Sequence, residues 1–169
     1  MVDVRDATPS DRSAIRDVHV ASVQGLAAEA YGDAVVEAWA KEDDRHLEGY
    51  DVDSEASVFL VAVADGKVVG FGELADGPGA TEAYDLAADG EIRAVYVAPE
   101  YAGEGVGTAL LGELESRGRD RGVSTVALTA SVNAAGFYEA HGYERVAETE
   151  HAFGDDAATG PVVVMRGRL

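Results

Sequence analysis

The chain has 169 residues, of which 32 are acidic and 13 are basic, and its formal net charge at pH 7 is −19. Such a length predicts one domain whose core needs no crosslinks, and the lack of cysteine excludes disulfides and a thiolate nucleophile. Acidic residues are spread along the sequence, so the whole folded surface is expected to be acidic, which disfavours nucleic acid as a partner.

The sequence predicts neither a signal peptide nor a membrane span. Asp3, Arg5 and Asp6 interrupt the N-terminus, and no apolar run approaches the roughly 18 residues of a membrane helix. A cytoplasmic protein with no membrane partner is therefore expected. An acidic surface that is poor in lysine suits a cytoplasm with molar salt, where the Debye length falls to about 3 Å. We expect the source to be a salt-adapted microbe.

The first segment of the chain predicts a strand followed by two helices. Val2–Ala7 alternates apolar and polar residues, and the Thr-Pro-Ser-Asp sequence that follows provides a cap and a proline for a helix start. A second helix is predicted over Gly32–Leu47. The inner face of the first helix is formed by Ile15, Val18, His19, Ser22, Val23 and Leu26, and the apolar positions of the second are Val35, Val36, Trp39 and Ala40.

A hairpin and a long loop are predicted next. Ala56–Ala64 has the composition of a buried strand, Asp65-Gly66 is a strong two-residue turn signal, and Lys67–Leu74 is expected to return antiparallel. Ala75–Gly90 is rich in glycine, aspartate and alanine and is predicted to be a loop.

The central stretch, Glu91–Leu114, reads as a strand, a glycine loop and a helix. Ile92–Val97 is β-branched and apolar, and Pro99 prevents pairing from continuing. Glycines at 103, 105 and 107 come directly before the apolar helical stripe of Val106, Leu110 and Leu114. The first turn of a helix carries unpaired N–H groups and the positive end of the dipole, so this loop is suited to binding phosphate. A tight turn without a ligand is the alternative.

The remaining sequence predicts a strand, a helix and two further strands. The central helix ends over Arg117–Gly122, and Val123–Ala130 is the next strand. Asn133 is expected to cap a short helix that Gly142 ends. The last strands are predicted at Tyr143–Phe153 and Pro161–Arg168, with Gly154–Gly160 as the hairpin loop between them.

Two segments resemble signatures of the GCN5-related N-acetyltransferases (GNAT family). The first, Tyr96–Leu111, is similar to the coenzyme A loop of that family, whose pattern is Arg or Gln, two residues, Gly, one residue, Gly or Ala. Gly105 and Gly107 match the glycines, whereas Ala102 stands at the Arg/Gln position and Glu104 adds a negative charge. The second, Ser131–Tyr143, resembles the later signature of Asn, then Phe-Tyr, then Gly-Tyr.

The resemblance implies an α/β fold with layers of helices on a mixed, mostly antiparallel sheet of about seven strands flanked by about four helices. It implies a single N-acetyltransferase domain over residues 1–169. It further implies acetyl-CoA as cosubstrate, no metal, and direct attack by a primary amine of a small molecule or protein in a ternary complex. Dimers are common in the family, so a homodimer is an open alternative.

The resemblance also assigns roles to residues, each with a plainer alternative. Val95, Tyr96 and Val97 are expected to pair with the pantetheine arm and polarise the carbonyl, although an ordinary strand ladder would also explain them. Tyr138 is expected to protonate the departing thiolate, and it would otherwise be a core tyrosine. Glu91 is expected to be the base that deprotonates the amine, and it would otherwise be a solvated surface carboxylate. Asn133 is expected to contact the pantetheine arm, and it would otherwise be only a helix cap. The main-chain amides that are expected to bind the pyrophosphate are those of Gly103, Glu104, Gly105, Val106, Gly107 and Thr108.

Other functions are weighed against this one. A non-catalytic domain that binds or senses acyl-CoA would keep the loop and lose the acceptor chemistry. A dinucleotide-binding domain would need a different glycine spacing after the first strand. His19 and His141 are expected to be packing residues, and no His/Asp/Glu cluster has the spacing of metal ligands.

Overall fold

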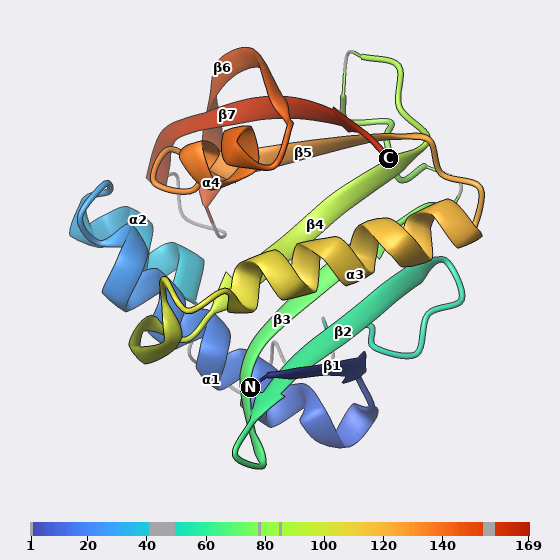
Figure 1. Cartoon of the computed structure of the whole chain (residues 1–169). Coiled ribbons are helices and arrows are strands. Elements are labelled where there is room, and N and C mark those ends of the chain that lie inside the picture. The colour runs from blue at the N-terminus through green and yellow to red at the C-terminus, as the bar shows by residue number, and fades with distance from the viewer. Residues whose placement is uncertain (1, 41–49, 78, 85, 154–157) are drawn as a thin grey trace.

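The computed structural model describes residues 2–40, 50–77, 79–84, 86–153 and 158–169, and in these residues seven strands form one sheet in the order β1-β2-β3-β4-β5-β7-β6 (Figure 1). The strands are β1 (Asp3–Asp6), β2 (Ser57–Ala64), β3 (Lys67–Ala75), β4 (Gly90–Val97), β5 (Thr125–Ser131), β6 (Glu144–Phe153) and β7 (Ala158–Arg168). The helices are α1 (Arg12–Ser22), α2 (Asp33–Ala40), α3 (Val106–Asp120) and α4 (Ala135–Ala140), with short helical turns η1 (Pro9–Asp11), η2 (Val23–Ala27) and η4 (Pro99–Tyr101). The predicted order of elements and the mixed, mostly antiparallel sheet are confirmed.

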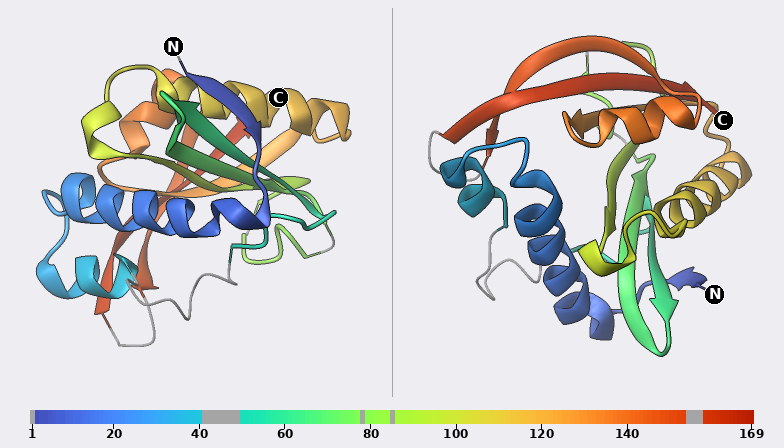
Figure 2. Two further views of the ribbon diagram at one scale, coloured as in Figure 1. Left: turned by 90° about the horizontal axis from the view of Figure 1, so that it is seen from below. Right: turned by 60° about the vertical axis from the view of Figure 1, so that its left-hand side comes forward.

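Helices cover both faces of the sheet. Figure 2 shows α1 and α3 on opposite sides of the central strands. On one face, Ile15 and Val18 of α1 pack against Phe59, Val61 and Phe71. On the other face, the apolar stripe of α3 and the buried side of α4 share a core with the strands, formed by residues such as Leu110, Leu111, Leu114, Ala135, Tyr138 and Met165. No helix in these parts of the chain is long and apolar enough to cross a membrane.

The start of α1 is built around Asp11. Its carboxylate accepts hydrogen bonds from the Thr8 N–H at 2.8 Å and from both terminal nitrogens of Arg5, at 2.8 and 3.0 Å. These bonds to Arg5 and Thr8 outweigh the effect of burial and lower the pKa of Asp11 to about 2. The predicted cap and proline are therefore confirmed, with η1 inserted between them and the α-helix.

The hairpin prediction is also confirmed. Asp65 and Gly66 both have positive φ, 52° and 75°, as a two-residue hairpin turn of the favoured type requires. Other predicted boundaries change. The helix predicted over Gly32–Leu47 is observed from Asp33 to Ala40, and its later residues lie outside the described parts of the chain.

Two local predictions are wrong. The N-cap of α4 is Ala134, and Asn133 makes no capping hydrogen bond, because the turn after β5 is closed by the Ala134 N–H bonding to the Ser131 carbonyl at 3.0 Å. The loop predicted over Gly154–Gly160 is shorter at its end, because β7 begins at Ala158, which pairs with Phe153. Cross-strand pairing thus extends further than the proline at 161 suggested.

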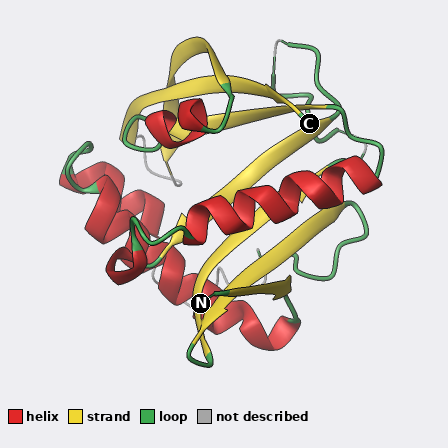
Figure 3. Ribbon diagram, viewed as in Figure 1, coloured by secondary structure: helices red, strands yellow, loops and turns green. Residues whose placement is uncertain are grey.

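Strands β4 and β5 separate soon after they meet. They pair in parallel at Gly90 and Glu91, opposite Val126 and Ala127, and no later pair follows among the described residues. The Asp89 carboxylate accepts hydrogen bonds from the N–H groups at 124 and 125 and holds the strands together at this end. Figure 3 shows that β4 and β5 diverge from the end at which Asp89 joins them. The sheet therefore opens along the edge of β4.

Candidate active site

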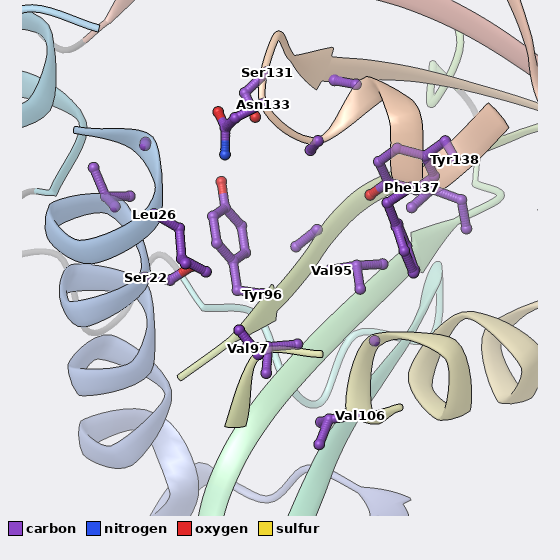
Figure 4. A pocket seen from close by; sticks show the side chains of 18 of the residues that line it. Ser22, Leu26, Val95, Tyr96, Val97, Val106, Ser131, Asn133, Phe137 and Tyr138 are labelled. Carbon is purple, nitrogen blue, oxygen red and sulfur yellow. The ribbon is translucent and has the colours of Figure 1, made fainter. Parts of the chain in front are cut away.

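A cavity of about 670 Å³ occupies the opening between β4 and β5 (Figure 4). β4 lines it from Ile92 to Val97, a stretch that pairs with β3 on one edge and has no partner in β5 on the other. The other walls come from the glycine loop and first turn of α3, the end of β5, the start of α4, η2 and α2. Elements far apart in the sequence therefore meet around one volume of the size that ligand sites occupy.

The cavity reaches both faces of the sheet. Val95 and Val97 pack toward the core that contains α3, whereas Ala94 and Tyr96 pack toward the core that contains α1. In Figure 4 the Tyr96 ring points toward Asn133, away from Val95. We call the two parts the α3 side and the α1 side of the cavity. The α3 side is lined by Val95, Val97, Gly103, Gly105, Val106, Gly107, Thr108, Phe137 and Tyr138, and the α1 side by Ser22, Val23, Leu26, Ala27, Trp39, Tyr96, Thr129 and Ser131.

The glycine loop presents unpaired donors to the α3 side. Gly103 and Gly105 have φ of 78° and 85°, and Gly105 is the N-cap of α3. The N–H groups of Gly105, Val106, Gly107 and Thr108 donate to no described carbonyl or side chain. Added to the positive end of the α3 dipole, these donors suit a phosphate group. The residues present therefore fit the diphosphate of coenzyme A.

Two departures from the family pattern have visible consequences. Ala102 lines the cavity but carries no side-chain donor, so the donors that this part of the wall offers are main-chain N–H groups. The N–H of Glu104 donates to the Tyr101 carbonyl at 3.3 Å, and Glu104 is not among the lining residues. Of the predicted loop residues, Glu104 is the one that the structure places outside the cavity wall.

The edge of β4 that faces β5 supports the prediction for Val95, Tyr96 and Val97. These residues pair with β3 on one side only, so main-chain groups on their other edge face the cavity. A bound chain with amide groups could pair there as an added strand does. The structure thus brings together these residues, the amides of the glycine loop and Asn133 around one cavity.

Tyr138 lies on α4 at the α3 side of the cavity (Figure 4). Its side chain is held by ring contacts with Phe137 and Tyr143, and the residue is 7% exposed. Burial raises the pKa of the Tyr138 phenol, and the nearby Tyr96 adds to the rise. No described residue hydrogen-bonds its hydroxyl. Tyr138 is therefore a protonated phenol whose donor is available to a ligand.

Glu91, the carboxylate predicted to act as a base, is held by its neighbours beside the cavity and is not a lining residue. The Tyr84 hydroxyl donates to Glu91 Oε2 at 2.6 Å, and Arg93 Nε donates to Oε1 at 2.8 Å. The Glu91 side chain is 17% exposed. Glu91 is therefore a predicted catalytic residue that does not line the cavity.

The α1 side contains residues that the sequence did not single out for function. Trp39 Nε1 donates to the Tyr96 hydroxyl at 3.2 Å, and burial raises the pKa of Tyr96 to about 12. The sequence predicts Leu26 and Trp39 only as apolar positions of helix faces, and their spacing alone gives no sign of the cavity. His19 and His141, which are predicted to be packing residues, do not line the cavity: His19 Nδ1 is 2.8 Å from the Tyr50 hydroxyl, and His141 Nε2 is 3.1 Å from Thr108 Oγ1.

Comparison with known proteins agrees with the fold. Residues 21–143 match the model of the acetyltransferase (GNAT) family. The chain is 32% identical over 152 residues to aminoglycoside N(6')-acetyltransferase type 1 of Stenotrophomonas maltophilia, a match that covers 87% of either chain.

Solved structures give the same answer. A GCN5-related N-acetyltransferase from Rhodopseudomonas palustris superposes with a TM-score of 0.82 at 27% identity, covering 99% of this chain and 95% of the other. The PaiA N-acetyltransferase of Thermoplasma acidophilum, solved with coenzyme A, gives 0.70 at 21% identity, covering 100% and 99%. The predicted resemblance is confirmed: the chain belongs to the acetyltransferase (GNAT) family and is an N-acetyltransferase that acts on an amine.

Proposed function

We propose that the cavity binds acetyl-CoA on its α3 side and a primary amine on its α1 side, and that the acetyl group passes directly between them in a ternary complex. The observation that carries this proposal is the row of unpaired N–H groups from Gly105 to Thr108, which face a cavity that crosses the sheet. A ligand whose diphosphate binds these amides and whose reactive group lies near Tyr138 would hold that group on the α3 side, next to the α1 side of the same cavity.

The protein's own groups have distinct tasks in this proposal. The amides at the start of α3 bind the diphosphate, and the free edge of β4 at Val95–Val97 aligns the pantetheine arm and polarises the carbonyl oxygen. Asn133 contacts that arm from the other wall. Acetyl-CoA, when bound, supplies the acetyl group as a thioester. Tyr138, which burial keeps protonated, donates a proton on the α3 side to the leaving sulfur.

Two acceptor classes are favoured by different observations. The curated relative is named as an aminoglycoside N-acetyltransferase, which favours an aminoglycoside amine. The cavity itself favours an amine with an apolar or aromatic body: Leu26, Trp39 and Tyr96 line its α1 side. Among the described lining residues there is no Asp or Glu that would pair with a polycation, and Arg93 is the charged one.

The test follows free thiol while the protein is mixed with acetyl-CoA and a panel of amines that includes kanamycin and phenethylamine. We expect thiol release that depends on the amine, and we expect Tyr138→Phe to lower kcat about 100-fold, as the loss of a general acid does. Coenzyme A affinity should stay within about twofold of the wild-type value, because no loop amide changes. Tight coenzyme A binding with no turnover of any amine would instead identify an acyl-CoA sensor.

We further propose that the enzyme works in a salt-rich cytoplasm. The net charge of −19 is carried at the surface, because Asp11 is the one acidic residue of the described chain that is buried. Self-repulsion among exposed carboxylates weakens as salt shortens the Debye length. Loss of structure on dialysis into dilute buffer would support this proposal, and full stability there would contradict it.

A further inference from the structure

A chain of hydrogen bonds leads from the cavity to the carboxylate that the cavity wall excludes. Thr129, on the α1 side, lines the cavity. Its Oγ1 donates to the Tyr84 hydroxyl at 3.2 Å, and the Tyr84 hydroxyl donates to Glu91 Oε2 at 2.6 Å. The three residues come from β5, from the loop between β3 and β4, and from the start of β4. The Tyr84 hydroxyl therefore links Thr129 in the cavity wall to the Glu91 carboxylate.

The fold brings these groups together at the narrow end of the opening. Glu91 is the last residue of β4 to pair with β5, opposite Ala127, and Thr129 is the next residue of β5 on the same face as Ala127. Beyond this point β4 and β5 separate. Ala127 therefore has β4 beside it, whereas Thr129 has the cavity beside it. Tyr84 fills the space between the Thr129 and Glu91 side chains.

The direction of the hydrogen bonds is fixed by the phenol. Burial raises the pKa of Tyr84, and the bond to Glu91 raises it further. Tyr84 therefore keeps its proton and donates it to the carboxylate, which leaves its oxygen to accept from Thr129. The hydroxyl oxygen of Thr129 remains able to accept a hydrogen bond from a ligand in the cavity. Both hydrogen bonds, from Thr129 to Tyr84 and from Tyr84 to Glu91, therefore run in the direction from the cavity toward Glu91.

We propose that Thr129 and Tyr84 relay the proton of the acceptor amine to Glu91. This inference rests on the proposed function. When the amine nitrogen bonds to the acetyl carbon it becomes acidic, and its N–H bond breaks toward Thr129 Oγ1. The Thr129 proton moves to the Tyr84 oxygen, and the Tyr84 proton moves to Glu91 Oε2. Each hydroxyl gains one proton and loses one, so the net change is a neutral carboxyl at Glu91, which can later release its proton to solvent.

The groups that face Glu91 and Tyr84 are consistent with this role. Arg93 Nε contacts Glu91 Oε1, the oxygen that Tyr84 does not use, so Oε2 is the one that receives the proton. Arg93 Nη1 also lies 3.6 Å from Oε1 of the half-buried Glu73, whose pKa is raised by burial. Arg93 thus fixes the orientation of the Glu91 carboxylate, and Tyr84 is a positioning and relay residue rather than one that touches the substrate.

The test compares variants in the amine-dependent thiol assay. We expect Tyr84→Phe and Thr129→Val each to lower kcat about 10- to 100-fold, because each interrupts proton transfer. Thr129→Ser, which keeps the hydroxyl, should stay within about threefold of wild type. Adding Tyr84→Phe to Glu91→Gln should cause no further loss, since both changes interrupt one path. The wild-type solvent deuterium effect on kcat should shrink in Tyr84→Phe.

Tyr143→Phe is the matched control, because the Tyr143 hydroxyl also donates to a carboxylate, Glu115 Oε1 at 3.1 Å, away from the cavity wall. The change removes only the hydroxyl and keeps the ring that contacts Tyr138, so kcat and the isotope effect should be unchanged. Coenzyme A affinity and the thermal midpoint report folding for every variant, and Thr129→Val keeps the test open if Tyr84→Phe disturbs its loop. The relay is overturned by wild-type kcat in Tyr84→Phe, or by losses from Tyr84→Phe and Glu91→Gln that simply add. Absence of amine-dependent turnover in the wild type would instead refute the proposed function.

Discussion

Gly105→Ala tests whether the backbone shape of the glycine loop controls cofactor binding. Gly105 has a φ of 85°, and a Cβ placed there would meet no atom within 4 Å. Steric contact with neighbours is therefore excluded, and the cost of the change is the left-handed backbone itself. Gly122, at the far end of α3, has a φ of 87° and equally open surroundings. The same change at Gly122 is thus a matched control for backbone strain.

The expected magnitude follows from that strain. A left-handed residue with a Cβ costs about 1–2 kcal/mol relative to glycine. If the loop relaxes to escape the strain, the N–H groups from Val106 to Thr108 lose their common direction, and the binding-competent loop becomes about 5- to 30-fold rarer. The dissociation constant for coenzyme A should rise by the same factor, because ligand binding must then restore the strained form.

The assay is calorimetric titration with coenzyme A, together with urea denaturation of each variant. Gly122→Ala should lose about 1–2 kcal/mol of stability and keep the wild-type dissociation constant. Gly105→Ala should show the rise in dissociation constant. Unchanged affinity in Gly105→Ala would refute the argument that the loop amides bind the cofactor, and an equal rise in Gly122→Ala would show that the effect is not local.

Three further outcomes are expected. Trp39→Ala should raise the KM for the amine about tenfold, or about 1.4 kcal/mol, without changing coenzyme A affinity, because Trp39 lines the α1 side; a matching loss of coenzyme A affinity would contradict the division of the cavity. Since the pKa of Asp11 is lowered to about 2 and half of Arg5 is exposed, Asp11 should add about 1–2 kcal/mol of stability above its unfolded pKa, lost as pH falls from about 4 to 2; acid titration of Asp11→Asn, which should lack this loss, checks it. Coenzyme A affinity should rise as salt increases from about 0.01 to 0.1 M, where the Debye length falls from about 30 to 10 Å; a steady fall over that range would show that side-chain cations dominate binding.

The sequence alone determined the features that depend on short-range backbone chemistry. The Asp65-Gly66 turn, the end of β4 before Pro99 and the glycine loop at the start of α3 were each predicted from a few adjacent residues, and each is observed. Val95, Val97 and the loop residues that line the α3 side of the cavity are predictable for the same reason, because they belong to one continuous strand, loop and helix, whereas Phe137 and Tyr138 reach this side from the separate helix α4. The N-cap of α4 is the exception. The sequence predicts Asn133 as the cap, whereas in the structure the cap is the next residue, Ala134, because the turn closes there.

Only the tertiary structure decided what lies on the α1 side of the cavity. Trp39, Leu26 and Thr129 come from three separate elements, and nothing in their local sequence shows that they will face one volume. The position of Glu91 was also decided by tertiary contacts, because Tyr84 reaches it from a loop whose path no periodicity describes. Local sequence fixes the backbone angles of each element, whereas the separation of β4 from β5 depends on how the whole sheet packs between its helices.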